Sequence, residues 1–463
     1  MSEVNIENDL SEESAEKASS AAETPDPEAE PTSGQVTEKT PEQASEETHT
    51  YGELIKGFIK WFIIAVIIGV IVGLAGTAFT KALGFANNFR NNNSWTVFIM
   101  PLAGLVIVFL YTICGLSKDP GTNNIIKGAR ADEEVSIKLA PLIFIATFLT
   151  HITGGSAGRE GAALQIGGSL ASPFGKLFRL DKKDFSTLIM CGMAAGFSAL
   201  FGTPIAAAVF AVEVTIVAAA QYSALVPCMV SSLTAVVTAK LFGVEPEAFH
   251  VAGVPSLGGG SAVDLLKVAL LGAACAALSV LFCFIMHNVG HLYKKYIKND
   301  YIRAAAGGVI IILLTLIVGN RDYNGAGMNI IEKAFEGEAF PLAFLLKILF
   351  TALTLGAGFK GGEIVPSFFA GAAFGCVFGG LIGLDPSFGA AVGLLAVFCG
   401  VTNCPFASII LSLELFGKTE GLAFYALAIS ISYMLSGYWG LYSAQKFYQS
   451  KLKPMKYFER KKS

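Results

Sequence analysis

Residues 154–162 read Gly154-Gly-Ser-Ala-Gly-Arg-Glu-Gly-Ala162, and residues 358–366 read Gly358-Phe-Lys-Gly-Gly-Glu-Ile-Val-Pro366. Both stretches place charged residues inside apolar sequence, where a charge is costly unless it has a function or a partner. Glycines leave backbone amides accessible, and a helix that begins just after them offers free N–H groups and a positive dipole end. Each stretch therefore predicts a helix that begins within a membrane and binds an anion at its N-terminus.

Glu160 is the strongest candidate functional residue of the first stretch. A carboxylate can occupy the same site as an anion when it is ionised and leave that site when it is protonated. We therefore predict that Glu160 is both gate and proton carrier, with Gly158, Arg159 and Gly161 in the anion site. The alternative is a structural ion pair between Arg159 and Glu160, which the comparable Gly-Gly-Glu of the second stretch makes less favoured.

The second stretch offers the backbone amides of Glu363, Ile364 and Val365 as anion donors, and Pro366 suits the first turn of the helix that follows. The side chain of Glu363 has two interpretations that the residues leave equal. It is either a second proton-handling carboxylate or a structural partner for Lys360 or another basic group.

Two further elements complete the predicted site. Gly121, Thr122 and Asn123 follow Pro120 in a polar turn whose side chains can donate hydrogen bonds to an anion, although capping of a helix by the same groups is the commoner role. Tyr442 can reach an anion through its hydroxyl, although an aromatic residue near the end of a span more often lies at the membrane interface.

The chain contains an internal repeat. The turn at Gly121 recurs at Gly327, the Glu160 stretch recurs at Glu363, and a proline followed nine residues later by a glutamate occurs twice, at Pro204/Glu213 and Pro405/Glu414. The order is the same in both series, which predicts two homologous halves with a substrate site between them. Glu213 and Glu414 are predicted to cap or brace neighbouring helix ends.

Composition and charge set the class and the domains. Hydrophobic residues make up 53% of the 463 residues and charged residues 15%, whereas soluble domains have about a quarter charged. We predict an acidic, disordered cytoplasmic tail (1–50), a first membrane repeat (51–242), a linker (243–261), a second membrane repeat (262–446) and a short basic cytoplasmic tail (447–463). Long apolar stretches such as Phe58–Leu83 alternate with short, glycine-interrupted ones such as Ile137–Ile152. Lysines flanking the first and last spans place both termini in the cytoplasm of a multi-pass plasma membrane protein.

These residues resemble a known family. Gly158-Arg-Glu-Gly161 with Gln165-Ile-Gly-Gly168, the stretch from Phe359 to Pro366 and Leu441-Tyr-Ser-Ala444 are similar to motifs of the chloride-channel (CLC) family of anion channels and anion/proton antiporters. The resemblance covers about residues 51–446. It implies an all-α integral membrane protein with two inverted-topology halves, and a homodimer with one pore per subunit. It makes Glu160 the external gating glutamate and Tyr442 the central pore tyrosine, and it places the central serine of the family at Thr122.

The chain also departs from the family pattern. Ala162 replaces the usual proline, and Val214 stands where many chloride/proton exchangers have an internal proton-transfer glutamate. Glu363 stands where typical chloride members have an apolar residue. The changed first loop, which reads Gly121-Thr-Asn-Asn124, the missing inner glutamate and the added Glu363 resemble the fluoride/proton exchanger branch. That branch, however, carries threonine at Val365 and typically methionine or asparagine at Thr122.

The predicted function is transport of chloride or fluoride across the lipid bilayer, by exchange for protons or, alternatively, through a passive channel gated by voltage or pH. No nucleophile–base set and no metal-ligand spacing occurs, so an enzyme is not expected, and no cofactor, metal or nucleic acid partner is predicted.

Overall fold

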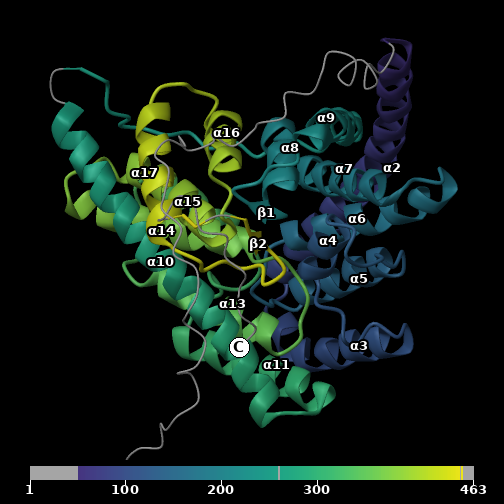
Figure 1. Cartoon of the computed structure of the whole chain (residues 1–463). Coiled ribbons are helices and arrows are strands. Elements are labelled where there is room, and N and C mark those ends of the chain that lie inside the picture. The colour runs from purple at the N-terminus through teal and green to yellow at the C-terminus, as the bar shows by residue number, and fades with distance from the viewer. Residues whose placement is uncertain (1–50, 259–260, 449, 452–463) are drawn as a thin grey trace, which may run out of the picture. The chain divides into compact units, whose positions relative to one another are not determined.

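The computed structural model describes residues 51–258, 261–448 and 450–451 (Figure 1). The predicted tail 1–50 and most of the predicted tail 447–463 lie outside the described residues. The chain divides into two units, Met1–Ile55 and Lys56–Ser463. Of the first unit only residues 51–55, the start of helix α2, are described, and the architecture below is that of the second.

Helices make up most of the described structure, in agreement with the expected all-α fold. The first half contains α2 (Tyr51–Asn92), η1 (Ser94–Ile99), α3 (Met100–Ile113), α4 (Thr122–Gly128), α5 (Leu139–Ile152), α6 (Glu160–Leu177), α7 (Lys182–Phe201), α8 (Pro204–Glu213), η2 (Tyr222–Ala224) and α9 (Leu225–Leu241). The second half contains α10 (Ser261–Tyr296), α11 (Asp300–Val318), α12 (Met328–Phe335), α13 (Ala343–Gly356), α14 (Ile364–Leu381), α15 (Pro386–Thr402), α16 (Pro405–Phe416) and α17 (Leu422–Leu435). Two short parallel strands, β1 (Ile216–Val217) and β2 (Lys446–Phe447), join the end of the chain to the first half.

The predicted repeat is visible in the element order. Helices α4 and α12 both begin one residue after the repeated glycines, and α6 and α14 begin at the two glycine-rich stretches. Equivalent helices of the two halves contact each other across the molecule, since α3 packs on α11, α6 on α14 and α8 on α16. Figure 1 shows the first-half helices in blue and teal meeting the green and yellow second-half helices.

The two halves are inverted relative to each other. The carboxylate of Glu213, at the end of α8, accepts hydrogen bonds from the amides of Phe406 (3.2 Å) and Ala407 (2.9 Å) at the start of α16. Glu414, near the end of α16, accepts from the amides of Ile205 (2.9 Å) and Ala206 (2.8 Å) at the start of α8. Each helix end thus meets the beginning of its equivalent, so the pair runs antiparallel. The predicted capping role of both glutamates is confirmed.

Loss of one of these caps is expected to destabilise the fold. Glu213→Ala leaves two amides at the start of α16 without an acceptor at a buried position, which costs about 2 kcal/mol. The thermal unfolding midpoint of the detergent-purified Glu213→Ala protein should fall. The midpoint of Glu213→Gln, which keeps one acceptor oxygen, should fall less. Equal midpoints for the alanine variant and the wild type would refute this capping role.

The core of each half is a pair of helices in backbone contact. Gly167 of α6 lies against Gly192 of α7, and Gly371 of α14 lies against Gly393 of α15, so closely that any side chain there would strike a backbone carbonyl. Small residues allow such close approach in membrane helix pairs. These packed pairs fix α6 and α14, the two helices whose N-termini carry the predicted site.

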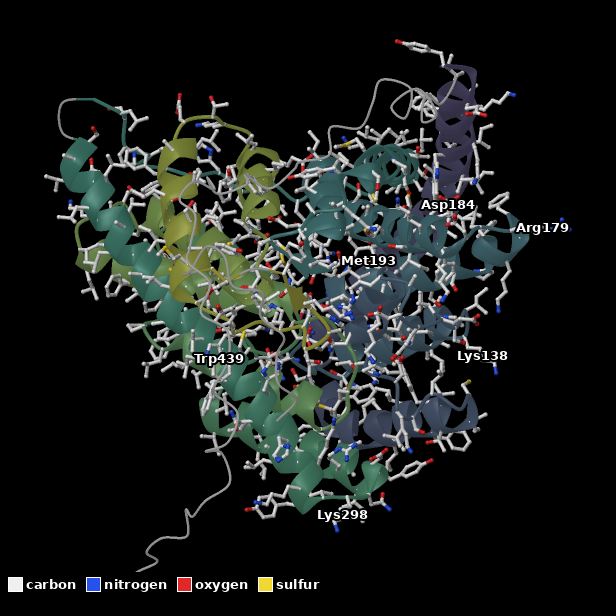
Figure 2. The ribbon with its side chains drawn as sticks, viewed as in Figure 1. Lys138, Arg179, Asp184, Met193, Lys298 and Trp439 are labelled. Atoms are coloured by element: carbon white, nitrogen blue, oxygen red, sulfur yellow. The ribbon has the colours of Figure 1, made fainter. Side chains whose placement is uncertain are left out.

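The outer surface suits a lipid environment. Seven of the described helices are long and apolar enough to cross a membrane, and several shorter apolar helices, including α8 and α16, are not. Large apolar side chains are exposed along α2, α3, α10 and α11. Figure 2 shows Met193 within the helix packing and the charged ends of Lys138, Arg179 and Lys298 at the periphery.

Candidate functional site

The two glycine-rich stretches meet where the halves join. Gly158 and Gly362 exchange two backbone hydrogen bonds of 2.7 Å each, one in either direction. A Cβ atom on Gly362 would lie 2.6 Å from the amide nitrogen of Gly161, which explains why this position has no side chain. The N-termini of α6 and α14 are thereby brought together, one from each half.

The carboxylate of Glu160 lies between these two N-termini. Its Oε2 accepts hydrogen bonds from the amides of Arg159 (3.0 Å) and Val365 (3.4 Å). Its side chain is 0% exposed, and Oε1 lies 3.5 Å from Nε of Arg159. Within the part of the chain that the structure describes, Oε1 has no hydrogen-bond partner. Both predicted interpretations are therefore present, because the carboxylate occupies the helix ends and also contacts Arg159.

The turn at Gly121 lies beside Gly161. Gly121 has a positive φ of 67°, and its amide donates to Oδ2 of Asp119 at 2.9 Å. Thr122, the first residue of α4, donates from its hydroxyl to the carbonyl of Gly161 at 3.4 Å and accepts from Nε2 of Gln165 at 3.2 Å. The threonine is buried, so its hydroxyl is held against the first turn of α6.

Asn123 braces the chain segment that carries Tyr442. Its Oδ1 accepts a hydrogen bond from the amide of Ala444 at 2.9 Å. Tyr442 is buried, and its hydroxyl has no hydrogen-bond partner among the described residues. It lies within electrostatic reach of both Glu363 and Glu160. The structure thus gathers the predicted tyrosine and both predicted carboxylates around one region.

A cluster of charged side chains outside the membrane-spanning helices contacts the segment that carries Tyr442. Arg130 donates to the carbonyl of Ala444 and pairs with Asp132 at 2.7 Å, and Lys446 lies 3.4 Å from that carboxylate. Burial acts to raise the pKa of Asp132, but the hydrogen bond and charge of Arg130, with the charge of Lys446, outweigh it and lower the pKa. A lowered pKa means that the cluster stabilises the fold at neutral pH and loses this contribution as the pH falls through the acidic range.

Glu363 is the residue just before α14, and its side chain is partly exposed. Ile364 and Val365 follow as the buried first residues of that helix. The ammonium of Lys360 lies over the ring of Tyr111, 4.4 Å from its centroid. In the part of the chain that the structure describes, no ion pair joins Glu363 to Lys360 or to another basic group.

The position of Val214 is buried and apolar. Its carbonyl accepts a hydrogen bond from Nε2 of Gln445 at 3.1 Å, and the same nitrogen donates to the carbonyl of Thr402 at 2.8 Å. Val214 therefore offers no titratable group at the place where the family resemblance puts an internal glutamate.

Four residues around the site were not predicted: Gln165, Gln445, Arg130 and Glu247. Gln165 belongs to a family motif, and its four-residue spacing from Gly161 places both residues on one helix face, which could have indicated a position at the site. The other three reach the site from distant parts of the chain. Glu247, in the linker between the halves, forms an ion pair with Arg159. No His, Cys, Asp or Glu cluster in the described part of the chain could hold a metal.

Comparison with known proteins shows to which family this chain belongs. The profile of the family described as "Voltage gated chloride channel" matches residues 116–437. A "Chloride/fluoride channel protein" of Pseudomonas syringae pv. tomato is 34% identical over 388 residues, which cover 82% of this chain and 85% of that protein. The chain belongs to the voltage-gated chloride channel (CLC) family.

Solved CLC structures agree with the fold. A CLC-type fluoride/proton antiporter superposes with a TM-score of 0.81 at 32% identity, covering 86% of this chain and 99% of that one. A slow cyanobacterial Cl−/H+ antiporter gives a TM-score of 0.70 at 18% identity over 81% of this chain and 94% of that one, a likeness of fold alone. The CLC-type fold and the family resemblance predicted from the motifs are confirmed.

Proposed function

We propose that this protein exchanges a small halide, chloride or fluoride, for protons across the membrane, with Glu160 as gate and proton carrier. The observation that carries the proposal is that the Glu160 carboxylate accepts hydrogen bonds from the amides of Arg159 and Val365. These amides lie at the N-termini of α6 and α14, one helix from each half. Such amides suit any small anion. The ionised carboxylate blocks the site, and protonation neutralises it, so that it leaves and an anion binds in its place.

Glu363 and Tyr442 support a proton route next to this site. Glu363 has no basic partner within the described residues and lies in electrostatic reach of Tyr442, as does Glu160. We therefore assign Glu363 as the second proton-handling carboxylate, with the amides of Ile364 and Val365 and the hydroxyls of Thr122 and Tyr442 around the anion. Two relatives above 30% identity carry fluoride in their names, which favours fluoride as the transported ion.

The alternative function is a passive chloride channel in which Glu160 only gates. Its support is Val214, which provides no titratable group at the inner position. The two functions differ in whether anion flow moves protons.

Replacing Glu363 with glutamine tests its proton role. The variant keeps the size of the side chain and removes the charge that changes on protonation. Proton movement coupled to the anion gradient should fall about a hundredfold, the low end of the effect of removing a proton-transfer group. Purified protein in liposomes loaded with chloride or with fluoride, with luminal pH followed during efflux, gives both the preferred ion and the coupling. Unchanged coupling in Glu363→Gln would make Glu363 structural.

We further propose the arrangement of the protein in its membrane. The repeats correspond to residues 51–242 and 262–446, and both termini lie in the cytoplasm of a cell with the protein in its plasma membrane. A homodimer is supported by apolar side chains exposed on α8 and α16, among them Ile205 and Phe406, which follow the two repeated prolines. A second copy of the chain would cover these positions.

A further inference from the structure

Arg159 stands between two carboxylates. Its Nε lies 3.5 Å from Oε1 of Glu160, and its other end forms a hydrogen-bonded ion pair with Oε1 of Glu247. The arginine side chain is 15% exposed and that of Glu247 27%, so water screens this pair only in part. The guanidinium of Arg159 therefore attracts both the carboxylate of Glu160 and that of Glu247. Glu247 belongs to the linker, of which the structure describes residues 243–258 before the second half begins.

The linker is fixed in place by both halves. The amide of Glu247 donates to the carbonyl of Phe201, the last residue of α7, at 3.0 Å, and the amide of Phe249 donates to the carbonyl of Leu415 in α16 at 2.9 Å. The ring of Phe249 also stacks on Phe335 at the end of α12, with ring centroids 4.7 Å apart. Glu247 is consequently held at a set position rather than sampling many, and it can orient the arginine that it binds.

We propose that Glu247 is a positioning residue that draws Arg159 away from Glu160 and so sets the pH at which the gate is protonated. This inference rests on the proposed gating role of Glu160. Without the Glu247 carboxylate, Arg159 has Glu160 as its remaining acidic partner, and the ionised gate gains attraction. Opening then requires a higher proton concentration, so the pH dependence of transport moves to lower pH.

The other charged or titratable groups near this pair do not replace Glu247. Tyr442 lies within electrostatic reach of Glu160, and Nε2 of His151 lies 3.4 Å from the carbonyl of Gly158, the residue before Arg159. Arg90 donates to the carbonyl of His151 at 3.2 Å, and Lys347 also lies within electrostatic reach of His151; both are basic. Within the described residues, Glu160 and Glu247 are the acidic partners of Arg159.

The test is the pH profile of anion efflux from liposomes, with the same pH on both sides of the membrane. Glu247→Gln keeps the size of the side chain and should lower the pH of half-maximal efflux by about one unit, a tenfold change in proton concentration. Glu336→Gln is the matched control, because Glu336 lines the same surface pocket as the linker residues Ala248 and His250. Its profile should coincide with that of the wild type.

A double variant separates positioning from a general structural effect. In an Arg159→Gln background, Glu247→Gln should no longer shift the profile, because the arginine that transmits the effect is absent. If Glu247→Gln cannot be purified, Glu247→Asp serves, because its shorter side chain weakens the contact and should give a smaller shift in the same direction.

The inference is overturned if Glu247→Gln or Glu247→Asp has the wild-type profile, or if the shift persists in the Arg159→Gln background. Failure of the proposed function looks different. In that case the wild type itself shows no pH dependence, or Glu160→Ala retains the dependence of the wild type.

Discussion

Replacing Glu160 with alanine is expected to abolish proton movement coupled to the anion gradient while leaving passive anion flow. The carboxylate is fully buried and accepts hydrogen bonds from backbone amides at the N-termini of α6 and α14. Its removal takes away the one group at this position that can hold a proton, and it leaves the amides free for an anion. In liposomes under an anion gradient, the change in luminal pH should fall to that of protein-free liposomes while efflux continues.

The control for this variant is Glu160→Gln, which imitates the protonated carboxyl group. It should also transport anions without protons, since a glutamine side chain neither takes up nor releases a proton in the working pH range. Retained coupling in either variant would exclude Glu160 as the proton carrier, and loss of anion efflux in both would show that the carboxylate supports the site rather than blocking it.

Adding a methyl group at Gly362 is expected to disrupt the site through its backbone. The Cβ atom of Gly362→Ala would lie 2.6 Å from the amide nitrogen of Gly161 and 3.1 Å from that of Glu160. Both are backbone atoms at the start of α6, so neither can turn aside as a side chain does. The pair of hydrogen bonds between Gly158 and Gly362 must open, and overpacking of this kind costs about 1–3 kcal/mol.

Anion efflux and coupling should therefore both fall by about tenfold or more in Gly362→Ala, since about 1.4 kcal/mol, in the lower part of that cost, already corresponds to a factor of ten. Gly84→Ala in α2 is the matched control, because a Cβ atom there has no neighbour within 4 Å. Wild-type efflux in Gly362→Ala would mean that the contact between the glycine-rich stretches does not shape the transport site.

Local signals in the sequence predicted the helix starts and the repeated caps. The glycines at Gly121 and Gly327 mark helix beginnings, because backbone and capping preferences act over a few residues. The apolar stretch Phe58–Leu83 predicted the first span but not its length, since α2 runs from Tyr51 to Asn92. Charged residues near its ends, such as Lys56 and Arg90, interrupt the apolar run without ending the helix.

Contacts between distant segments could not be predicted in this way. Hydropathy does not tell an inverted repeat from a parallel one, and only the exchange of caps between α8 and α16 gives the direction. Asn123 was predicted to donate to an anion, and no local pattern indicates the second contact that its Oδ1 makes with the amide of Ala444, 321 residues later. Glu247 belongs to no recognisable motif. Its contact with Arg159, 88 residues away, arises because the folded linker lies beside the start of α6.

The central claim is that one site, shared by the N-termini of α6 and α14, binds an anion and the Glu160 carboxylate in turn. The most direct test is luminal pH in liposomes that hold the purified wild-type protein, under a fluoride or chloride gradient and with no initial pH gradient. We expect outward anion flow to drive protons inward, so that the lumen acidifies, and we expect reversal of the anion gradient to reverse the sign of the pH change. Anion flow of the same size with no pH change in either direction would contradict it.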